Sequence, residues 1–160
     1  KARSWTIRPP GRAPDLRKAV ASAIRANARD YLSPGFKGAS YLGIRKLASS
    51  LPEWLDIAPD AAKDLELAAL LMQKAGTGGS LFRNFYRDFL REAREYLPSP
   101  TTLKRAQDSF TASAEEWAAV AHLVEDAGRR SDAAPLRAAA ARCLRIADVE
   151  LEAMRLLAEL

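Results

Sequence analysis

Two long stretches near the end of the chain constrain its fold more than any other feature. Apolar residues recur every three or four positions over 103–124 and again over 136–158, which is the spacing of helices that bury one face. Gly128 lies between them and is expected to close the first helix. Two long helices with a short turn are expected to form an antiparallel hairpin. Alanines on their facing positions permit a close approach.

Proline and glycine clusters divide the rest of the chain into shorter segments. Helices with an apolar stripe are predicted over 15–31, 39–50, 60–74 and 80–96. In the last of these, Phe82, Phe85 and Phe89 are expected to share the inward face. Residues 3–8, which include Trp5, favour a short strand. A lone strand must lie over the core or pair with another domain or chain.

The expected fold class is therefore all-α. We expect one domain over residues 1–160, built as a bundle of about six helices with the C-terminal hairpin. An extended arm over 1–12 is expected to contact a partner domain or subunit. A hydrophobic content of 48% is enough to bury a sizeable core. The chain has no run of about 18 apolar residues, so no membrane span is expected.

The chain has one cysteine, Cys143, and one histidine, His122. This count excludes a disulfide within the chain and a zinc site of Cys and His ligands. We expect no metal and no cofactor. Cys143 stands among alanines, so a small buried residue is favoured over a nucleophile, and a free thiol fits the cytoplasm. His122 could act as a base, but a histidine with no evident partner is more typical of a surface.

Charge is distributed unevenly along the chain. Residues 1–50 contain 11 Lys and Arg against Asp15 and Asp30, a net +9, whereas residues 51–160 carry a net −4. The basic third predicts an anionic substrate or an acidic partner, and a solvated arginine-rich face is the plainer interpretation. Nucleic acid is the weaker expectation, because nothing resembles a helix-turn-helix reader.

A glycine-rich turn is the sharpest local motif. It comprises Gly76, Thr77, Gly78, Gly79 and Ser80, and it precedes a helix that carries Arg83 and Arg87. Backbone N–H groups at a helix N-terminus attract anions, so phosphate, sulfate or carboxylate would suit this turn. No lysine follows the last glycine, which excludes a Walker A loop. The structural alternative is a turn with positive φ angles that lets two helices pack closely.

Five further residues are candidates for the same site. Tyr86 follows Arg83 and either hydrogen-bonds a ligand or packs in the core as a satisfied phenol. Lys37, Tyr41 and Trp54, with Ser40 among them, surround a glycine-containing loop and could line the mouth of a ligand site. The alternative for Tyr41 and Trp54 is an ordinary place in the core. The candidate catalytic residues are thus Arg83, Tyr86 and His122.

The chain resembles the domain family DUF4872. The most specific part is residues 76–93, GTGGSLFRNFYRDFLREA; residues 31–54, YLSPGFKGASYLGIRKLASSLPEW, fit the same pattern. Trp5, Ile7 and Trp117 also fit. Ser80 departs from the glycine or other small residue expected there. This domain forms the C-terminal half of proteins similar to the butirosin biosynthesis protein H.

The resemblance implies an all-helical partner of a papain-like half. In such proteins the papain-like half supplies the nucleophile and the base, and transfers an aminoacyl group from a carrier protein to an amine. The present chain contains no such half, so the resemblance implies a cut-out C-terminal domain or a separately encoded subunit of a heterodimer.

Two reactions remain open under this resemblance. One is acyl or aminoacyl transfer from an acidic carrier protein. The other is ring closure by an amine with loss of an anionic leaving group, as in the aziridine-forming proteins of azinomycin-type pathways. The alternative to both is a non-catalytic module that docks an acidic carrier protein.

Overall fold

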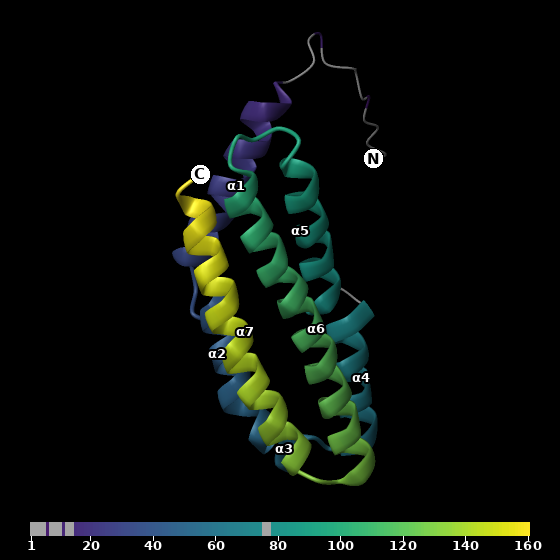
Figure 1. The fold of residues 1–160 in the computed structure, drawn as a ribbon. Coiled ribbons are helices and arrows are strands. Elements are labelled where there is room, and N and C mark those ends of the chain that lie inside the picture. The colour runs from purple at the N-terminus through teal and green to yellow at the C-terminus, as the bar shows by residue number, and fades with distance from the viewer. Residues whose placement is uncertain (1–5, 7–10, 12–14, 75–77) are drawn as a thin grey trace.

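The structure is a computed structural model that describes Thr6, Gly11 and residues 15–74 and 78–160. Within this part every regular element is a helix, which confirms the all-α prediction. The elements are α1 (Leu16–Leu32), α2 (Ser40–Ser50), the 3-10 turn η1 (Leu51–Glu53), α3 (Trp54–Ile57), α4 (Ala61–Lys74), α5 (Ser80–Ala93), α6 (Pro100–Arg130) and α7 (Ala134–Ala158) (Figure 1). The predicted strand over 3–8 and arm over 1–12 lie outside the described residues, apart from Thr6 and Gly11.

Helices α6 and α7 run the length of the molecule in opposite directions and pack on each other (Figure 1). They contain 31 and 25 residues. Gly128 does not close α6 as predicted, because the helix continues to Arg130 and ends at Ser131 in the left-handed conformation. Gly128 instead lets α4 approach: a Cβ at this position would lie 2.7 Å from the carbonyl oxygen of Ala61. The glycine thus serves packing and not chain reversal.

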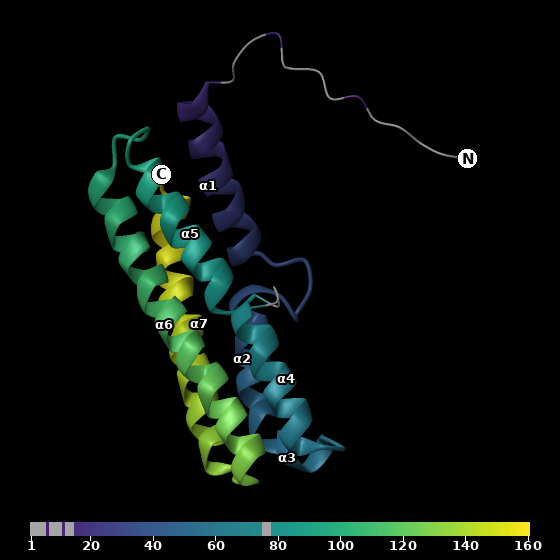
Figure 2. The same cartoon turned by 90° about the vertical axis from the view of Figure 1, so that its right-hand side faces the viewer.

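Each long helix is covered by two shorter helices arranged end to end. Helices α1 and α2 pack on α7, and helices α4 and α5 pack on α6. Helix α1 ends at Leu32 and α2 begins at Ser40, whereas α4 ends at Lys74 and α5 begins at Ser80. Both breaks lie near the middle of the long helices, so the N-terminal ends of α2 and α5 meet there (Figure 2).

Two apolar cores fill the bundle. The lower core is formed by α2, α4 and the turn-proximal halves of α6 and α7, and includes Ile44, Leu65, Trp117, Val124, Leu136, Cys143 and Ile146. The upper core is formed by α1, α5 and the other halves of α6 and α7, and includes Ile24, Leu90, Leu103, Phe110, Met154 and Leu157. Ser113 of α6 and Glu150 of α7 are buried and belong to neither core. They lie between the two cores in sequence.

The prediction that Phe82 and Phe85 face inward is wrong: their side chains are 48% and 59% exposed. Helix α5 instead turns Arg83, Tyr86 and Leu90 toward the interior. This orientation brings Arg83 to the buried Glu150, and the pairing offsets part of the cost of burying the carboxylate. The predicted placement of Tyr86 and Phe89 against the core is confirmed.

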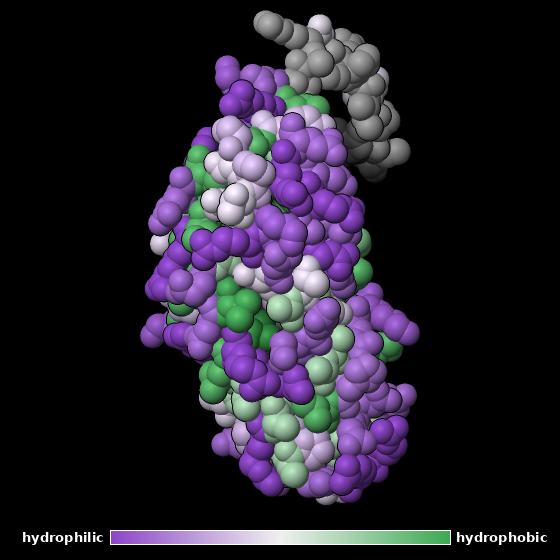
Figure 3. Space-filling model, in the orientation of Figure 1, coloured by the Kyte–Doolittle hydropathy of each residue, from purple (hydrophilic) through white to green (hydrophobic). Residues whose placement is uncertain are grey.

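Figure 3 shows polar groups over most of one face, with apolar groups gathered near its middle. In the described residues no helix is both long enough and apolar enough to cross a membrane.

Candidate functional site

A buried carboxylate lies between the two cores. The Glu150 side chain is 1% exposed and accepts four hydrogen bonds. Nε and Nη2 of Arg83 donate to its Oε1 and Oε2 at 2.7 and 2.9 Å. The Tyr31 hydroxyl donates to Oε2 at 2.8 Å, and the Ser113 hydroxyl donates to Oε1. We call Glu150, Arg83, Tyr31 and Ser113 the polar layer. It draws together α1, α5, α6 and α7.

The polar layer keeps Glu150 ionised. Burial by itself raises the pKa of a carboxyl group, but the Arg83 charge and the hydrogen bonds from Ser113 and Tyr31 outweigh it. The pKa of Glu150 is therefore below its usual value. Burial, and then the negative charge of Glu150, raise the pKa of Tyr31 far above its usual value. The polar layer thus contains one ion pair, Arg83–Glu150, and the neutral phenol of Tyr31.

Arg83 connects the polar layer to the glycine turn. Its guanidinium lies 5.1 Å from the centre of the Trp117 ring, which is a cation–π distance. Its third nitrogen, Nη1, is not used by Glu150 and would lie 3.5 Å from a Cβ at Gly78. One side of the guanidinium is therefore neutralised by Glu150, and the other is directed toward the turn.

A cavity of about 280 Å³ lies on the Nη1 side of Arg83. We call it the glycine cavity; it is lined by Gly38, Ser40, Gly43, Ile44, Leu47, Gly78, Arg83 and Trp117. Among the described residues, the buried Ser40 hydroxyl and the Trp117 indole N–H have no hydrogen-bond partner. Ser40 opens α2, and Gly78 lies two residues before α5. Neither helix has a side-chain cap. Hydrogen-bond donors without acceptors therefore line this cavity.

A second cavity, of about 460 Å³, lies on the upper side of Arg83. We call it the aromatic cavity; it is lined by Asn27, Asp30, Tyr31, Ala39, Ser40, Phe82, Arg83, Tyr86, Phe110, Glu150 and Met154. The rings of Tyr86 and Phe110 meet edge to face, with their centres 4.7 Å apart. The Tyr86 hydroxyl is buried without a hydrogen bond in the described chain. Burial raises the pKa of Tyr86 to about 12, with a smaller opposing effect from Asn27.

The structure brings part of the predicted glycine turn to the glycine cavity. Gly78 has a φ of +93° and lines it, which suits a residue without a side chain. Gly79 precedes α5, and a Cβ there would lie 1.8 Å from the carbonyl oxygen of Met72. Gly79 is thus required for the contact of α4 with α5, as in the structural alternative. Ser80 is the first residue of α5 and lines neither cavity; Gly76 and Thr77 lie outside the described residues.

Other predicted residues lie apart from both cavities. Arg87 hydrogen-bonds Asn84 at 2.6 Å and forms an ion pair with Asp88 at 3.1 Å. Trp54 donates to the Ser50 hydroxyl at 3.3 Å. Two further candidates lie nearby without lining either cavity: Tyr41 packs against the lower core, and Lys37 is exposed on the loop before α2.

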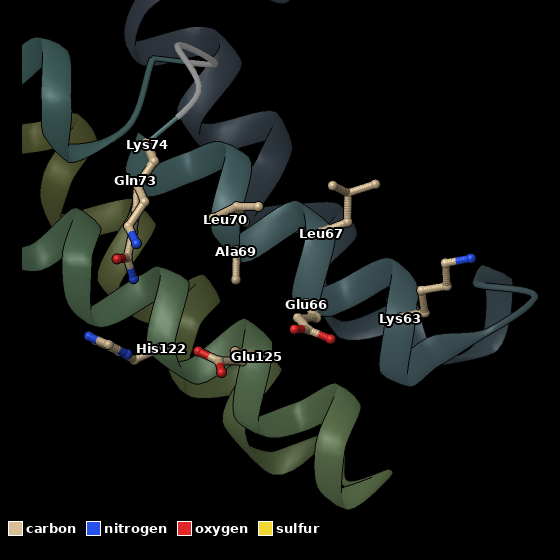
Figure 4. Close-up of a pocket in the computed structure, with 9 residues that line it drawn as sticks. All are labelled: Lys63, Glu66, Leu67, Ala69, Leu70, Gln73, Lys74, His122 and Glu125. Atoms are coloured by element: carbon tan, nitrogen blue, oxygen red, sulfur yellow. The ribbon is translucent and has the colours of Figure 1, made fainter.

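His122 lies in a separate surface groove of about 430 Å³ between α4 and α6. Figure 4 shows His122 and Glu125 extending from α6 on the side that faces α4, with Glu66 and Gln73 opposite. His122 itself is exposed. The described residues contain no cluster of three or more His, Cys, Asp or Glu side chains that could hold a metal ion. The buried donors that favour ligand binding are at the other two cavities.

Cys143 is buried in the lower core, as predicted. Burial raises the pKa of the Cys143 thiol to about 12, so it is protonated at neutral pH. It lines neither cavity and is far from being an activated nucleophile. His122 and Cys143 therefore do not form a catalytic pair.

The sequence prediction missed Glu150, Tyr31 and Ser113. For Glu150 a signal was present, because it follows Cys143 by two helical turns and so occupies the apolar stripe of α7. A carboxylate in such a stripe requires a buried partner. No comparable signal marks Ser113, because serine is common in helices.

Comparisons with known proteins give one match. The family model described as "Domain of unknown function (DUF4872)" matches residues 1–157. No curated protein and no solved structure matches the chain.

Proposed function

The chain belongs to the family of the domain of unknown function DUF4872, and on this premise we propose that it is the helical part of a secondary-metabolite biosynthesis enzyme. In this proposal it completes the active site of a papain-like half or subunit. It binds an anionic or carrier-tethered substrate at the glycine cavity.

The observation that carries the proposal is the set of unused donors at the glycine cavity. The Ser40 hydroxyl and the Trp117 N–H are buried without acceptors, and Nη1 of Arg83 lies beside them. A buried donor left unpaired costs about 1–3 kcal/mol, which an oxyanion can recover by accepting from it. The N-terminal ends of α2 and α5 add favourable partial charge. A carboxylate, sulfate or phosphate group of a substrate suits this environment.

The need for a partner rests on what the described residues contain. Cys143 is a buried neutral thiol, and His122 lies in another groove. Neither cavity is lined by a nucleophile with an adjacent base. A papain-like partner would supply both. The exposed rings of Phe82 and Phe85, whose centres are 6.2 Å apart, offer an apolar surface beside the aromatic cavity for such a partner.

Two reactions are compatible with this arrangement. In acyl transfer, a thiolate of the partner attacks the thioester carbonyl of the carrier-bound substrate, and the bond to the carrier sulfur breaks to release the carrier thiol. An amine then attacks the acyl group, the partner thiolate leaves, and a base of the partner accepts the amine proton. In ring closure, an amine attacks a carbon while the bond to the anionic leaving group breaks and a base of the partner accepts the amine proton. The glycine cavity would hold the departing anion. Replacing the partner cysteine with alanine distinguishes the two, because only transfer requires it.

Association with a partner can be tested by reconstitution with a papain-like protein encoded beside the chain. The double variant Phe82→Ser, Phe85→Ser should weaken the complex by about tenfold or more, because apolar anchors dominate such interfaces. Ile57→Ser is the matched control, since Ile57 is also exposed but lies on α3. Equal affinities for both variants, or full turnover by the papain-like protein alone, would contradict the proposal.

Anion binding can be tested separately in the complex. Ser40→Ala removes one donor without touching the Arg83–Glu150 pair, and should lower turnover by about tenfold or more if the donor stabilises developing charge. The matched control is Ser49→Ala, whose hydroxyl only bonds the Lys46 carbonyl on the exposed side of α2. Unchanged turnover in Ser40→Ala would place the anion elsewhere.

A docking module for an acidic carrier protein is the second candidate. The observation in its favour is the exposed basic face of α1, with Arg17, Lys18, Arg25 and Arg29. Electrostatic docking must weaken as salt rises, because exposed charges are screened. The affinity of the chain for a carrier protein should therefore fall between about 0.05 and about 0.5 M salt. An affinity that does not change over this range would exclude electrostatic docking.

A further inference from the structure

We propose that the aromatic cavity is a separate binding site for an uncharged ring that carries one amide-like hydrogen-bonding group. This goes beyond the proposed function, because it needs no partner and concerns the other cavity; the two cavities share Ser40 and Arg83, but Tyr86, Phe82 and Phe110 line the aromatic cavity alone. Size, charge and hydrogen bonding each support this ligand class.

The size and lining of the cavity suit a ring. Its volume of about 460 Å³ lies within the usual range of about 300–1,000 Å³ for small-molecule sites. Phe82, Phe110, Met154 and the ring of Tyr86 provide apolar and aromatic contacts. Edge-to-face and offset contacts with aromatic side chains favour a flat ligand.

The charges around the cavity exclude a strongly charged ligand. Glu150 and Arg83 line it but neutralise each other through two hydrogen bonds. Asp30 also lines it, and its carboxylate is exposed and paired with Arg29 at 3.3 Å. Among the described residues that line the cavity, Arg83 is the only cation and is already paired with Glu150, so an anionic ligand would be buried without a counter-charge, which is costly.

Two buried hydroxyl groups at the aromatic cavity are available to hydrogen-bond a ligand. The Tyr86 hydroxyl is buried and forms no hydrogen bond of standard geometry, although the Asn27 side chain lies close enough to lower its pKa slightly. The Ser40 hydroxyl is also buried without a partner in the described part of the chain, and it lines both cavities. Each can donate to a carbonyl oxygen. The Asn27 amide also lines the cavity and can accept from an N–H group. A neutral carboxamide on a ring satisfies both kinds of group.

The test compares three probes of similar shape on the isolated chain by protein-observed NMR. Benzamide carries the amide, benzoate replaces it with a charge, and toluene lacks a polar group. We expect benzamide to shift amides of α1, α5 and α7 residues around the cavity, and to bind about tenfold or more tightly than benzoate. Absence of benzamide binding, shifts confined to another surface, or preference for benzoate would overturn the proposal.

Variants assign the binding to the named groups. Tyr86→Phe keeps the contact with Phe110 but removes the hydroxyl, so benzamide affinity should fall about threefold to tenfold while that of toluene stays the same. Phe82→Leu should weaken both probes, whereas Phe85→Leu should not, since Phe85 is the adjacent exposed ring that does not line the cavity. An unchanged benzamide affinity in Tyr86→Phe overturns the assignment. Because Tyr86 and Phe82 line the aromatic cavity and not the glycine cavity, the outcome of these variants is independent of the proposed function.

Discussion

The lower and upper halves of the molecule use the same two long helices but pack them differently. In the lower core, α6 and α7 contribute many small residues, including Ala121, Ala127, Gly128, Ala139 and Ala147. These small residues stand beside larger ones such as Trp117 and Leu136. In the upper core the same two helices contribute mainly large side chains, among them Leu103, Phe110 and Leu157, with Ala106 and Ala153 as the small ones. Small residues let helices approach closely and leave little room between them.

The two cavities lie on opposite sides of the polar layer that separates these halves. The glycine cavity is lined by Ile44 and Trp117 of the lower core, and the aromatic cavity by Phe110 and Met154 of the upper core. The cavities form where the covering helices are interrupted (Figure 2). Arg83 lies between them, with unpaired hydrogen-bond donors on the side of the glycine cavity and the neutralised Glu150 pair on the side of the aromatic cavity.

The largest loss of stability is expected when Arg83, which lies between the two cavities, is removed. Arg83→Ala leaves the Glu150 carboxylate buried without a counter-charge, and should lower the free energy of unfolding by about 3–5 kcal/mol. Urea denaturation followed by circular dichroism measures it. The double variant Arg83→Met, Glu150→Leu should recover most of the loss, because well-packed apolar residues can replace a buried ion pair. A loss below about 1 kcal/mol in Arg83→Ala would mean that water reaches Glu150.

The next effect tests the close packing of the lower half. Gly128→Ala places a Cβ 2.7 Å from the Ala61 carbonyl oxygen and 2.8 Å from the Leu65 Cβ, so α4 must move away from α6. Overpacking of this kind should lower the free energy of unfolding by about 1–3 kcal/mol. A gain in stability would contradict the packing role, since alanine otherwise favours a helix interior over glycine by about 1 kcal/mol. Thermal unfolding compares the variant with wild type.

The helices were largely predictable from the sequence, because proline or glycine lies near the start of most of them and their apolar residues follow the helical period; the end of α6, which passes Gly128, was not. The helix predicted over 60–74, for example, occurs as Ala61–Lys74. The face that α5 buries was not predictable from α5 alone. Its phenylalanine stripe and its Arg83–Tyr86–Leu90 stripe have the same period, and the choice depends on Glu150, which lies 67 residues away from Arg83.

The candidate site was predictable only in part for the same reason. Arg83, Tyr86 and Gly78 stand close together in a recognisable motif, and each lines a cavity. Tyr31 and Ser113 reach Glu150 from 119 and 37 residues away, and nothing in their local sequence marks them as its partners. Contacts at such separations follow from the fold and not from local patterns.

Alkaline pH should weaken the lower half through Cys143. Its thiol has a pKa raised by burial to about 12, against 9.0 when unfolded, so the folded state retains a proton that the unfolded state loses. Below about pH 9 the thiol is protonated in both states and costs no stability. Above that pH the free energy of unfolding falls, by about 1.4 kcal/mol at pH 10. Urea unfolding of wild type and Cys143→Ala at pH 8 and about pH 10 checks it. The variant should lose less stability between these pH values; equal losses would show that the thiol does not contribute.

The smallest effect is expected at an ion pair that differs from Arg83–Glu150 mainly in exposure. Asp148 is two residues before Glu150 on α7 and accepts a hydrogen bond from Arg45 at 2.8 Å, close to the 2.7 Å between Arg83 and Glu150. Its side chain is 68% exposed, against 1% for Glu150. Exposed pairs contribute about 0.2–1 kcal/mol and are screened by salt.

Asp148→Ala should therefore change the free energy of unfolding by less than about 1 kcal/mol, and the change should vanish in about 1 M NaCl. The loss in Arg83→Ala should persist in the same salt, because ions do not screen a buried charge. Urea denaturation of both variants with and without salt makes the comparison within one helix. If salt reduced both losses of stability equally, burial would not explain why the Arg83–Glu150 pair contributes more than the Arg45–Asp148 pair. Water and ions would then reach Glu150 in the polar layer.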